Sequence, residues 1–173
     1  ALILVVAVLL FALGVRTSLF VAIAIPLSML LSFVMIDMFG MTLNMVVLFS
    51  LILALGMLVD NGIVIVENIY RHAELGKSSF QASIDGTREV ALAVTASTLT
   101  TVAAFAPLVF WTGIMGQFMS YLPKTVIIVL SSSLGVALVV LPVATALLMP
   151  SKREGFEEMN RGPILRAYQA VLE

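Results

Sequence analysis

Apolar residues fill this chain in long blocks, separated by short stretches that contain polar residues or glycine. The blocks cover residues 1–13, 19–36, 43–70, 87–110 and 118–149. A helix needs about 20 mostly apolar residues to cross the ~30 Å hydrocarbon core of a bilayer. The pattern therefore predicts an all-α membrane protein with five transmembrane helices. The first block is too short to cross alone, so we expect it to be the end of a truncated helix.

The breaks between blocks carry recognisable helix-boundary signals. Gly40 and Gly76 are expected to stop the helices that precede them, because glycine tolerates the left-handed backbone found there. Ser78 to Gln81 fits a capping box and predicts a short helix that closes at Asp85-Gly86, before the fourth membrane segment. Pro26 lies inside the second block and should kink its helix, since proline lacks the N–H and clashes with the preceding turn.

The last 23 residues differ in character from the rest, so we expect a transmembrane domain over 1–150 and a linker over 151–173. Gly162-Pro163 precedes a pattern of apolar residues, with polar residues between them, at Ile164, Leu165, Tyr168 and Val171. The spacing predicts an amphipathic helix lying in the membrane interface. A frayed chain end is the alternative.

Composition narrows the class of protein further. The chain is 61% hydrophobic and 11% charged, whereas a soluble domain carries about 25% charged residues. It has no cysteine, which excludes a disulfide framework and a thiolate metal site. A formal net charge of −1 provides no broad basic surface, so nucleic acid is not an expected partner. The chain opens on an apolar run without Met or a basic region, and we expect it to be an internal piece of a longer polypeptide.

Basic residues predict the orientation, because cytoplasmic loops are enriched in Lys and Arg. Eight fall on one side of the predicted membrane: Arg16, Arg71, Lys77, Arg88, Lys152, Arg153, Arg161 and Arg166. The other side has only Lys124. We therefore expect the loop 71–86 and the tail 151–173 to be cytoplasmic, and the loops near Gly40 and Gly113 to face outward.

The most informative polar residues are Asp60 and Asn61, in the middle of the third membrane block. An ionised carboxylate at membrane depth costs several kcal/mol and is tolerated mainly where it faces protein or water and serves a function. Asp60, Val64 and Glu67 share one helix face at i, i+4 and i+7, and Asn61 lies about 100° round. We interpret Asp60 as a proton carrier; a static buried hydrogen-bonding role is the alternative. Its cationic partner must come from other sequence, since helical spacing brings none near.

The remaining polar candidates are weaker. We interpret Glu67 as an interfacial pair with Arg71 at i+4; a proton-entry role is the alternative. Thr98 and Thr101 belong to a hydroxyl-rich stretch that predicts helix packing, with a hydrated proton path as the second interpretation. His72 is expected to be solvated. The sequence contains no nucleophile–base set, phosphate loop or metal-ligand spacing, so we expect neither an enzyme nor a bound cofactor or metal.

The segment Gly56–Ile69, which contains Asp60-Asn61, closely resembles the fourth transmembrane helix of the resistance-nodulation-division (RND) efflux permeases. Phe39–Asn44 resembles the family's outer turn between helices three and four, Phe105–Leu108 the end of helix five, and Leu141–Ala146 the end of helix six. The resemblance implies helices two to six of a twelve-helix bundle, so that this chain forms part of one half. The tail would be the cytoplasmic helix that links the two halves.

The resemblance also implies a function. RND permeases are proton-driven antiporters of the bacterial inner membrane that export hydrophobic or amphiphilic compounds. They are normally homotrimers working with a periplasmic adaptor and an outer-membrane channel. In drug-exporting members, two adjacent Asp residues form the proton relay with a Lys and an Arg from helices ten and eleven. Asp60 matches the first Asp, and Asn61 replaces the second; metal-exporting relatives also keep only the first, so one acid can suffice.

Other functions remain open on the sequence. Protein-translocation motors and lipid- or metal-handling relatives share the helix arrangement without exporting drugs. A non-transporting membrane scaffold is a further alternative. The family's substrate pockets lie in large periplasmic domains, so the sequence of this chain does not name a substrate.

Overall fold

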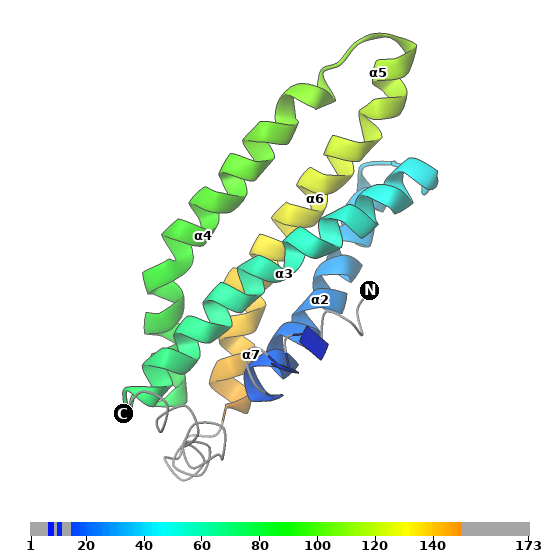
Figure 1. The fold of residues 1–173 in the computed structure, drawn as a ribbon. Helices are drawn as coiled ribbons and strands as arrows, with labels where there is room; N and C mark the ends of the chain where they lie inside the picture. Colours follow the sequence, from blue (N-terminus) through cyan, green and yellow to red (C-terminus); the bar gives the residue numbers. More distant parts are fainter. Residues whose placement is uncertain (1–6, 9, 12–14, 150–173) are drawn as a thin grey trace, which may run out of the picture.

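The computed structural model describes residues 7–8, 10–11 and 15–149 (Figure 1). Within them the helices are α2 (Val15–Met38), α3 (Met45–Glu74), α4 (Ser79–Val109), α5 (Gly113–Met119), α6 (Tyr121–Gly135), a π-helical turn (Val136–Val140) and α7 (Leu141–Leu148). The described part of the chain contains no strand, which confirms the predicted all-α class. Most of the predicted first membrane segment and the whole amphipathic tail lie outside the described residues.

Four stretches of these helices are long and apolar enough to cross a membrane: Thr17–Met38, Met45–Glu74, Ser79–Val109 and Tyr121–Leu148. They correspond to the second to fifth predicted segments. Figure 1 shows them running lengthwise beside one another. The turn at Gly40 and helix α5 lie at one end of the bundle, which we call the Gly40 end. The turn at Gly76 and the end of α7 lie at the other, the Gly76 end.

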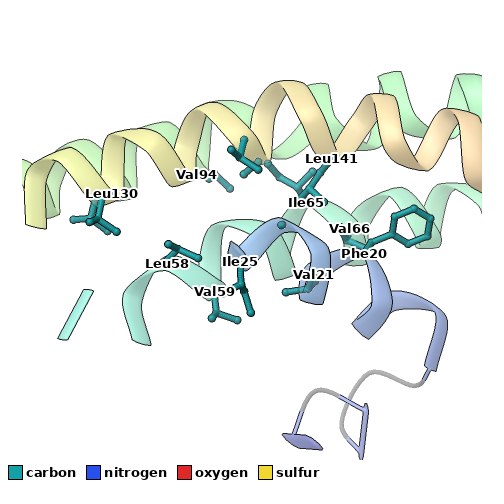
Figure 2. Close-up of a cluster of buried hydrophobic side chains, with 14 of the residues drawn as sticks. Phe20, Val21, Ile25, Leu58, Val59, Ile65, Val66, Val94, Leu130 and Leu141 are labelled. Atoms are coloured by element: carbon teal, nitrogen blue, oxygen red, sulfur yellow. The ribbon is translucent and has the colours of Figure 1, made fainter. Parts of the chain in front are cut away.

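Helix α3 is central, since it packs against α2, α4 and α6. Figure 2 shows the core where side chains of α2, α3, α4 and α6–α7 meet. Val21, Ile65 and Val66 in this cluster have no exposed surface, and Ile25 has 1%. Hydroxyl groups join the helices as well: Ser133 of α6 donates to the Leu58 carbonyl of α3 over 2.9 Å. Such bonds contribute to packing where lipid removes the hydrophobic drive between helices.

The predicted stops at Gly40 and Gly76 are confirmed. Gly40 has a φ of 64° and Gly76 one of 89°, values that favour glycine. The Gly76 N–H donates to the Ala73 carbonyl, which closes the end of α3. Ser78 then caps α4, since its hydroxyl accepts from the Gln81 N–H over 3.3 Å.

The predicted short helix ending at Asp85-Gly86 is wrong, because α4 continues through both residues to Val109. Gly86 is buried against α3, where an added Cβ would lie 2.8 Å from the Ile69 Cα and 2.9 Å from the Ile69 nitrogen. Its missing side chain therefore permits close contact of two helix backbones. The glycine that suggested a helix end is a packing position inside a helix.

The last membrane segment is not a uniform α-helix. Its π-helical turn, Val136–Val140, ends two residues before Pro142, and the Leu141 N–H donates to the Val136 carbonyl five residues back. Proline provides no N–H and crowds the preceding turn, so a local π-bulge adapts the hydrogen bonding around it. No such π-helical turn accompanies Pro26 in the described residues, since α2 is assigned as α-helix on both sides of it.

Candidate functional site

The polar stripe predicted on the third membrane segment lies on one exposed face of α3. Asp60, Val64 and Glu67 are all exposed there, together with Leu53 and Gly56 toward the Gly40 end. Their spacing of three or four residues repeats the helical turn, which explains why they share a face. None of the described helices covers these side chains. The surface is thus the one side of the central helix that is left open.

Asn61 has different surroundings, although it is the next residue. It is 9% exposed and faces α4, where the Thr98 hydroxyl donates to its Oδ1 over 3.2 Å. Its Nδ2 is buried and has no hydrogen-bond partner among the described residues. Asn61 forms no hydrogen bond with Asp60 within the described part of the chain. The structure therefore brings Asn61 and Thr98 together and separates both from the Asp60 carboxylate.

The neighbouring hydroxyls of α4 bond within their own helix. Thr100 donates to the Ala96 carbonyl over 2.8 Å, and Thr101 donates to the Ser97 carbonyl over 3.1 Å. Thr98 alone among these three threonines reaches across to α3. This arrangement is typical of helix packing, and the geometry does not bring Thr101 to the Asn61 amide.

The expected ion pair between Glu67 and Arg71 is wrong. Arg71 instead forms an ion pair with Glu89 of α4, its Nη2 lying 2.7 Å from Oε2 and 2.8 Å from Oε1. Glu89 also accepts from the Asn68 amide over 3.1 Å. A carboxylate on the adjacent helix thus offers both oxygens to Arg71, and Glu67 stays exposed without an ion pair among the described residues.

The prediction of a solvated His72 is also wrong. Its side chain is 13% exposed, and Nε2 lies 2.7 Å from Glu89 Oε2. Its Nδ1 lies 3.0 Å from the ammonium of Lys77, which pairs with Asp85 over 2.7 Å. We call these residues the Glu89 cluster: Asn68, Arg71, His72, Lys77, Asp85 and Glu89. The i, i+4 spacing of Asp85 and Glu89 was the sequence signal for it, because it places two acids on one face of α4.

A polar cavity of about 660 Å³ lies beside this cluster, at the Gly76 end. Its lining comes from the start of α2, from α3 and from α4, and includes Thr17, Val64, Glu67 and Glu89. Val64 lies one helical turn from Asp60 on the same face of α3. Water entering the cavity would therefore reach the neighbourhood of the Asp60 carboxylate. The described residues contain no group of three or more His, Asp or Glu side chains that could hold a metal ion.

The fold and site define a class of protein: a helical membrane protein with two acidic residues, Asp60 and Glu67, on the open face of its central helix. The chain matches the family model described as "AcrB/AcrD/AcrF family" over residues 1–172, and it belongs to that family of RND permeases. This membership confirms the resemblance found in the motif around Asp60.

Individual relatives agree with this assignment. The chain is 34% identical over 147 residues to multidrug resistance protein MdtC of Salmonella paratyphi B and 35% identical over 147 residues to MdtC of Klebsiella pneumoniae. Each alignment covers 85% of this chain and 14% of the relative. The chain thus spans about a seventh of the length of the relatives it matches.

Proposed function

We propose that this chain is a transmembrane portion of a proton-driven efflux transporter and that Asp60 carries the coupling proton. The observation that carries the proposal is the position of Asp60: exposed on the open face of the central membrane helix, with no cationic partner among the described residues. A carboxylate at this depth needs a partner or water. A helix from the rest of the transporter, packed on that face, would supply both a cation and a closed environment.

The two protonation states of such a site favour different arrangements of the transporter. Ionised Asp60 attracts a cation on the opposing helix, whereas protonated Asp60 has lost that attraction and can be buried at lower cost. Proton binding and release would thereby shift the two halves relative to each other, which is how alternating access operates in transporters built from repeated halves. This coupling drives export of hydrophobic or amphiphilic compounds.

The other predicted relay residues take supporting roles in the proposal. Asn61 holds α3 against α4 through Thr98 and does not carry the proton, because an amide has no titratable group in the physiological range. Glu67, at the lining of the polar cavity, would offer one route by which protons released from Asp60 reach the Gly76 end, which we propose to be cytoplasmic. A secondary path that includes Thr98 and Thr101 stays a prediction, and their bonding favours packing.

The proposed partners follow from family membership. They are the remaining half of the same transporter, further copies in a homotrimer, a periplasmic adaptor and an outer-membrane channel. We propose that the transporter itself lies in the bacterial inner membrane. The relatives' name, multidrug resistance protein, supports a drug-exporting function. A translocation motor or a lipid- or metal-handling transporter with the same helices is the second candidate, because Asn61 stands where drug exporters carry Asp.

Drug resistance of cells tests this proposal. Cells that produce the full-length protein with Asp60→Asn, at matched levels, should lose resistance, whereas Glu67→Gln should keep most of it. Asp60→Asn removes one titratable group and changes side-chain size very little. Full resistance in cells with Asp60→Asn would refute the assignment of Asp60 as the proton carrier. Wild-type cells with no resistance to any amphiphilic drug would favour the second candidate.

A further inference from the structure

A second cavity lies far along the bundle from the polar one, at the Gly40 end. Its volume is about 410 Å³, and its walls come from the turn after α2, the end of α4 and the first turns of α6. The lining residues are apolar except for one lysine: Phe39, Met41, Val109, Lys124, Ile127 and Ile128. Cavities of 300–1,000 Å³ are the usual size of sites for small ligands. We call this the Lys124 groove.

The lysine in this groove has no acidic partner. Its ammonium lies 6.0 Å from the centre of the Tyr121 ring, and no carboxylate of the described residues lies within ion-pair distance. Arg71 and Lys77, at the Gly76 end, are paired with Glu89 and Asp85. An unpaired cation at the edge of an apolar cavity matches a ligand with one negative charge and a long apolar part.

Aromatic side chains indicate the depth of the groove in the membrane. Trp111 is 62% exposed at the Gly40 end, and Tyr121 and Lys124 lie in the first turn of the membrane-length stretch Tyr121–Leu148. Trp and Tyr gather at the level of lipid headgroups, where one part of the ring system meets hydrocarbon and another meets water. Lys124 therefore lies at headgroup depth. Ile127 and Ile128 follow about one turn further along α6, toward the hydrocarbon core.

We propose that the Lys124 groove binds an anionic phospholipid, with its phosphate on the Lys124 ammonium and one acyl chain against Ile127 and Ile128. The charge at the mouth and the apolar wall below it match the order of headgroup and chain in a lipid. Free phosphate does not fit this arrangement, because apolar side chains provide no further hydrogen-bond donors. The site is separate from Asp60 and stands whether or not Asp60 carries a proton.

Native mass spectrometry of the full-length protein tests this site. The purified protein is mixed with phosphatidylglycerol or with phosphatidylcholine of the same acyl chains. Wild-type protein should retain phosphatidylglycerol preferentially. Lys124→Gln should lower that retention roughly fivefold, because a roughly fivefold change in affinity is the usual contribution of one cation near an anionic lipid surface. Lys124→Arg should keep it. Arg88→Gln, which removes an exposed cation at the other end, is the matched control and should bind as wild type.

A second substitution tests the apolar wall. Ile128→Trp fills the groove and should lower retention of both lipids, whereas Val139→Trp, at an exposed position outside the groove, should change neither. Unchanged melting temperatures of the variants confirm that they are folded. The proposal would be overturned if Lys124→Gln retained phosphatidylglycerol as well as wild type does, or if wild type did not prefer phosphatidylglycerol to phosphatidylcholine. A wild-type protein that retains neither lipid, or an Ile128→Trp variant that retains both as wild type does, would also overturn it.

Discussion

At the scale of single residues, Asp60 and Asn61 show how adjacent positions on a helix serve different surroundings. Asp60 is exposed on the open face of α3, and Asn61 is buried against Thr98. A rotation of about 100° per residue accounts for the difference. The Asp60 carboxylate lies where a further helix can pack on it, and the uncharged Asn61 amide lies between α3 and α4. The two positions should therefore respond differently to substitution.

The hydrogen bond between Thr98 and Asn61 can be tested by a double-mutant cycle. Thr98→Val leaves the side-chain amide oxygen of Asn61 buried without its hydrogen-bond donor and should reduce the free energy of unfolding by about 1–2 kcal/mol. In the Asn61→Leu background, which has no polar group to leave unpaired, the same change should cost much less. Unfolding in mixed micelles provides the free energies. Additive effects of the two substitutions would show that the bond contributes nothing.

Residue patterns located the candidate site in part. The motif around Asp60 and its helical face followed from spacing alone, because i, i+4 and i+7 positions must share a side. The partners of Arg71 and His72 did not, because Glu89 is 18 residues from Arg71 along the chain and meets it only when α4 packs on α3. Sequence spacing describes contacts within one helix, and the Glu89 cluster depends on contacts between two.

At the scale of helices, Gly86 sets how closely α3 and α4 approach. Gly86→Ala places a Cβ against the Ile69 backbone, which cannot move aside as a flexible side chain would. We expect a loss of about 1–3 kcal/mol in unfolding free energy and a lower melting temperature. Gly135→Ala is the matched control, since nothing lies within 4 Å of its added Cβ. That variant should be as stable as wild type or slightly more stable.

Measurement of thermal unfolding in detergent for both variants decides the role of Gly86. A Gly86→Ala protein with the melting temperature of the Gly135→Ala protein would contradict close backbone packing. The same glycine also explains why the short helix was predicted wrongly. Asp85-Gly86 has the composition of a helix end, and only the neighbouring helix reveals that the glycine makes room.

The Glu89 cluster should stabilise the packing of α3 against α4 at the Gly76 end. Glu89→Gln removes the carboxylate that pairs with Arg71 and contacts His72, so it should lower the melting temperature. Glu74→Gln, at an exposed acid without an ion pair among the described residues, should have little effect. Because exposed charges are screened, the difference should shrink as salt is raised from low to molar concentration. Equal melting temperatures of the Glu89→Gln and Glu74→Gln proteins at low salt would contradict a stabilising role of the cluster.

At the scale of the whole molecule, the order of the membrane helices followed from block lengths, and the structure confirms the second to fifth predicted segments as helices long enough to cross a membrane. The break-up of the last segment into α6, a π-helical turn and α7 did not follow, because hydrogen bonding around Pro142 depends on local geometry. The orientation in the membrane rests on the distribution of Lys and Arg and stays a prediction.

Cysteine labelling tests that orientation. Leu75 is 72% exposed at the Gly76 end, and Thr112 is exposed at the Gly40 end. In the full-length protein, a membrane-impermeant maleimide should label Thr112→Cys in intact spheroplasts and Leu75→Cys only after permeabilisation. Ser79 is unsuitable, because it is buried and donates to the Met149 carbonyl. Labelling of Leu75→Cys from outside would reverse the predicted topology.

Proton movement through the reconstituted full-length transporter examines Asp60 most directly. Proteoliposomes with a pH-sensitive dye inside and an imposed pH gradient report proton flux when an amphiphilic drug is added. Wild-type protein should show drug-dependent flux, Glu67→Gln and Asn61→Ala should retain most of it, and Asp60→Asn should show none while remaining folded. Drug-dependent proton flux in the Asp60→Asn protein at the wild-type rate would contradict the assignment of Asp60 as the proton carrier.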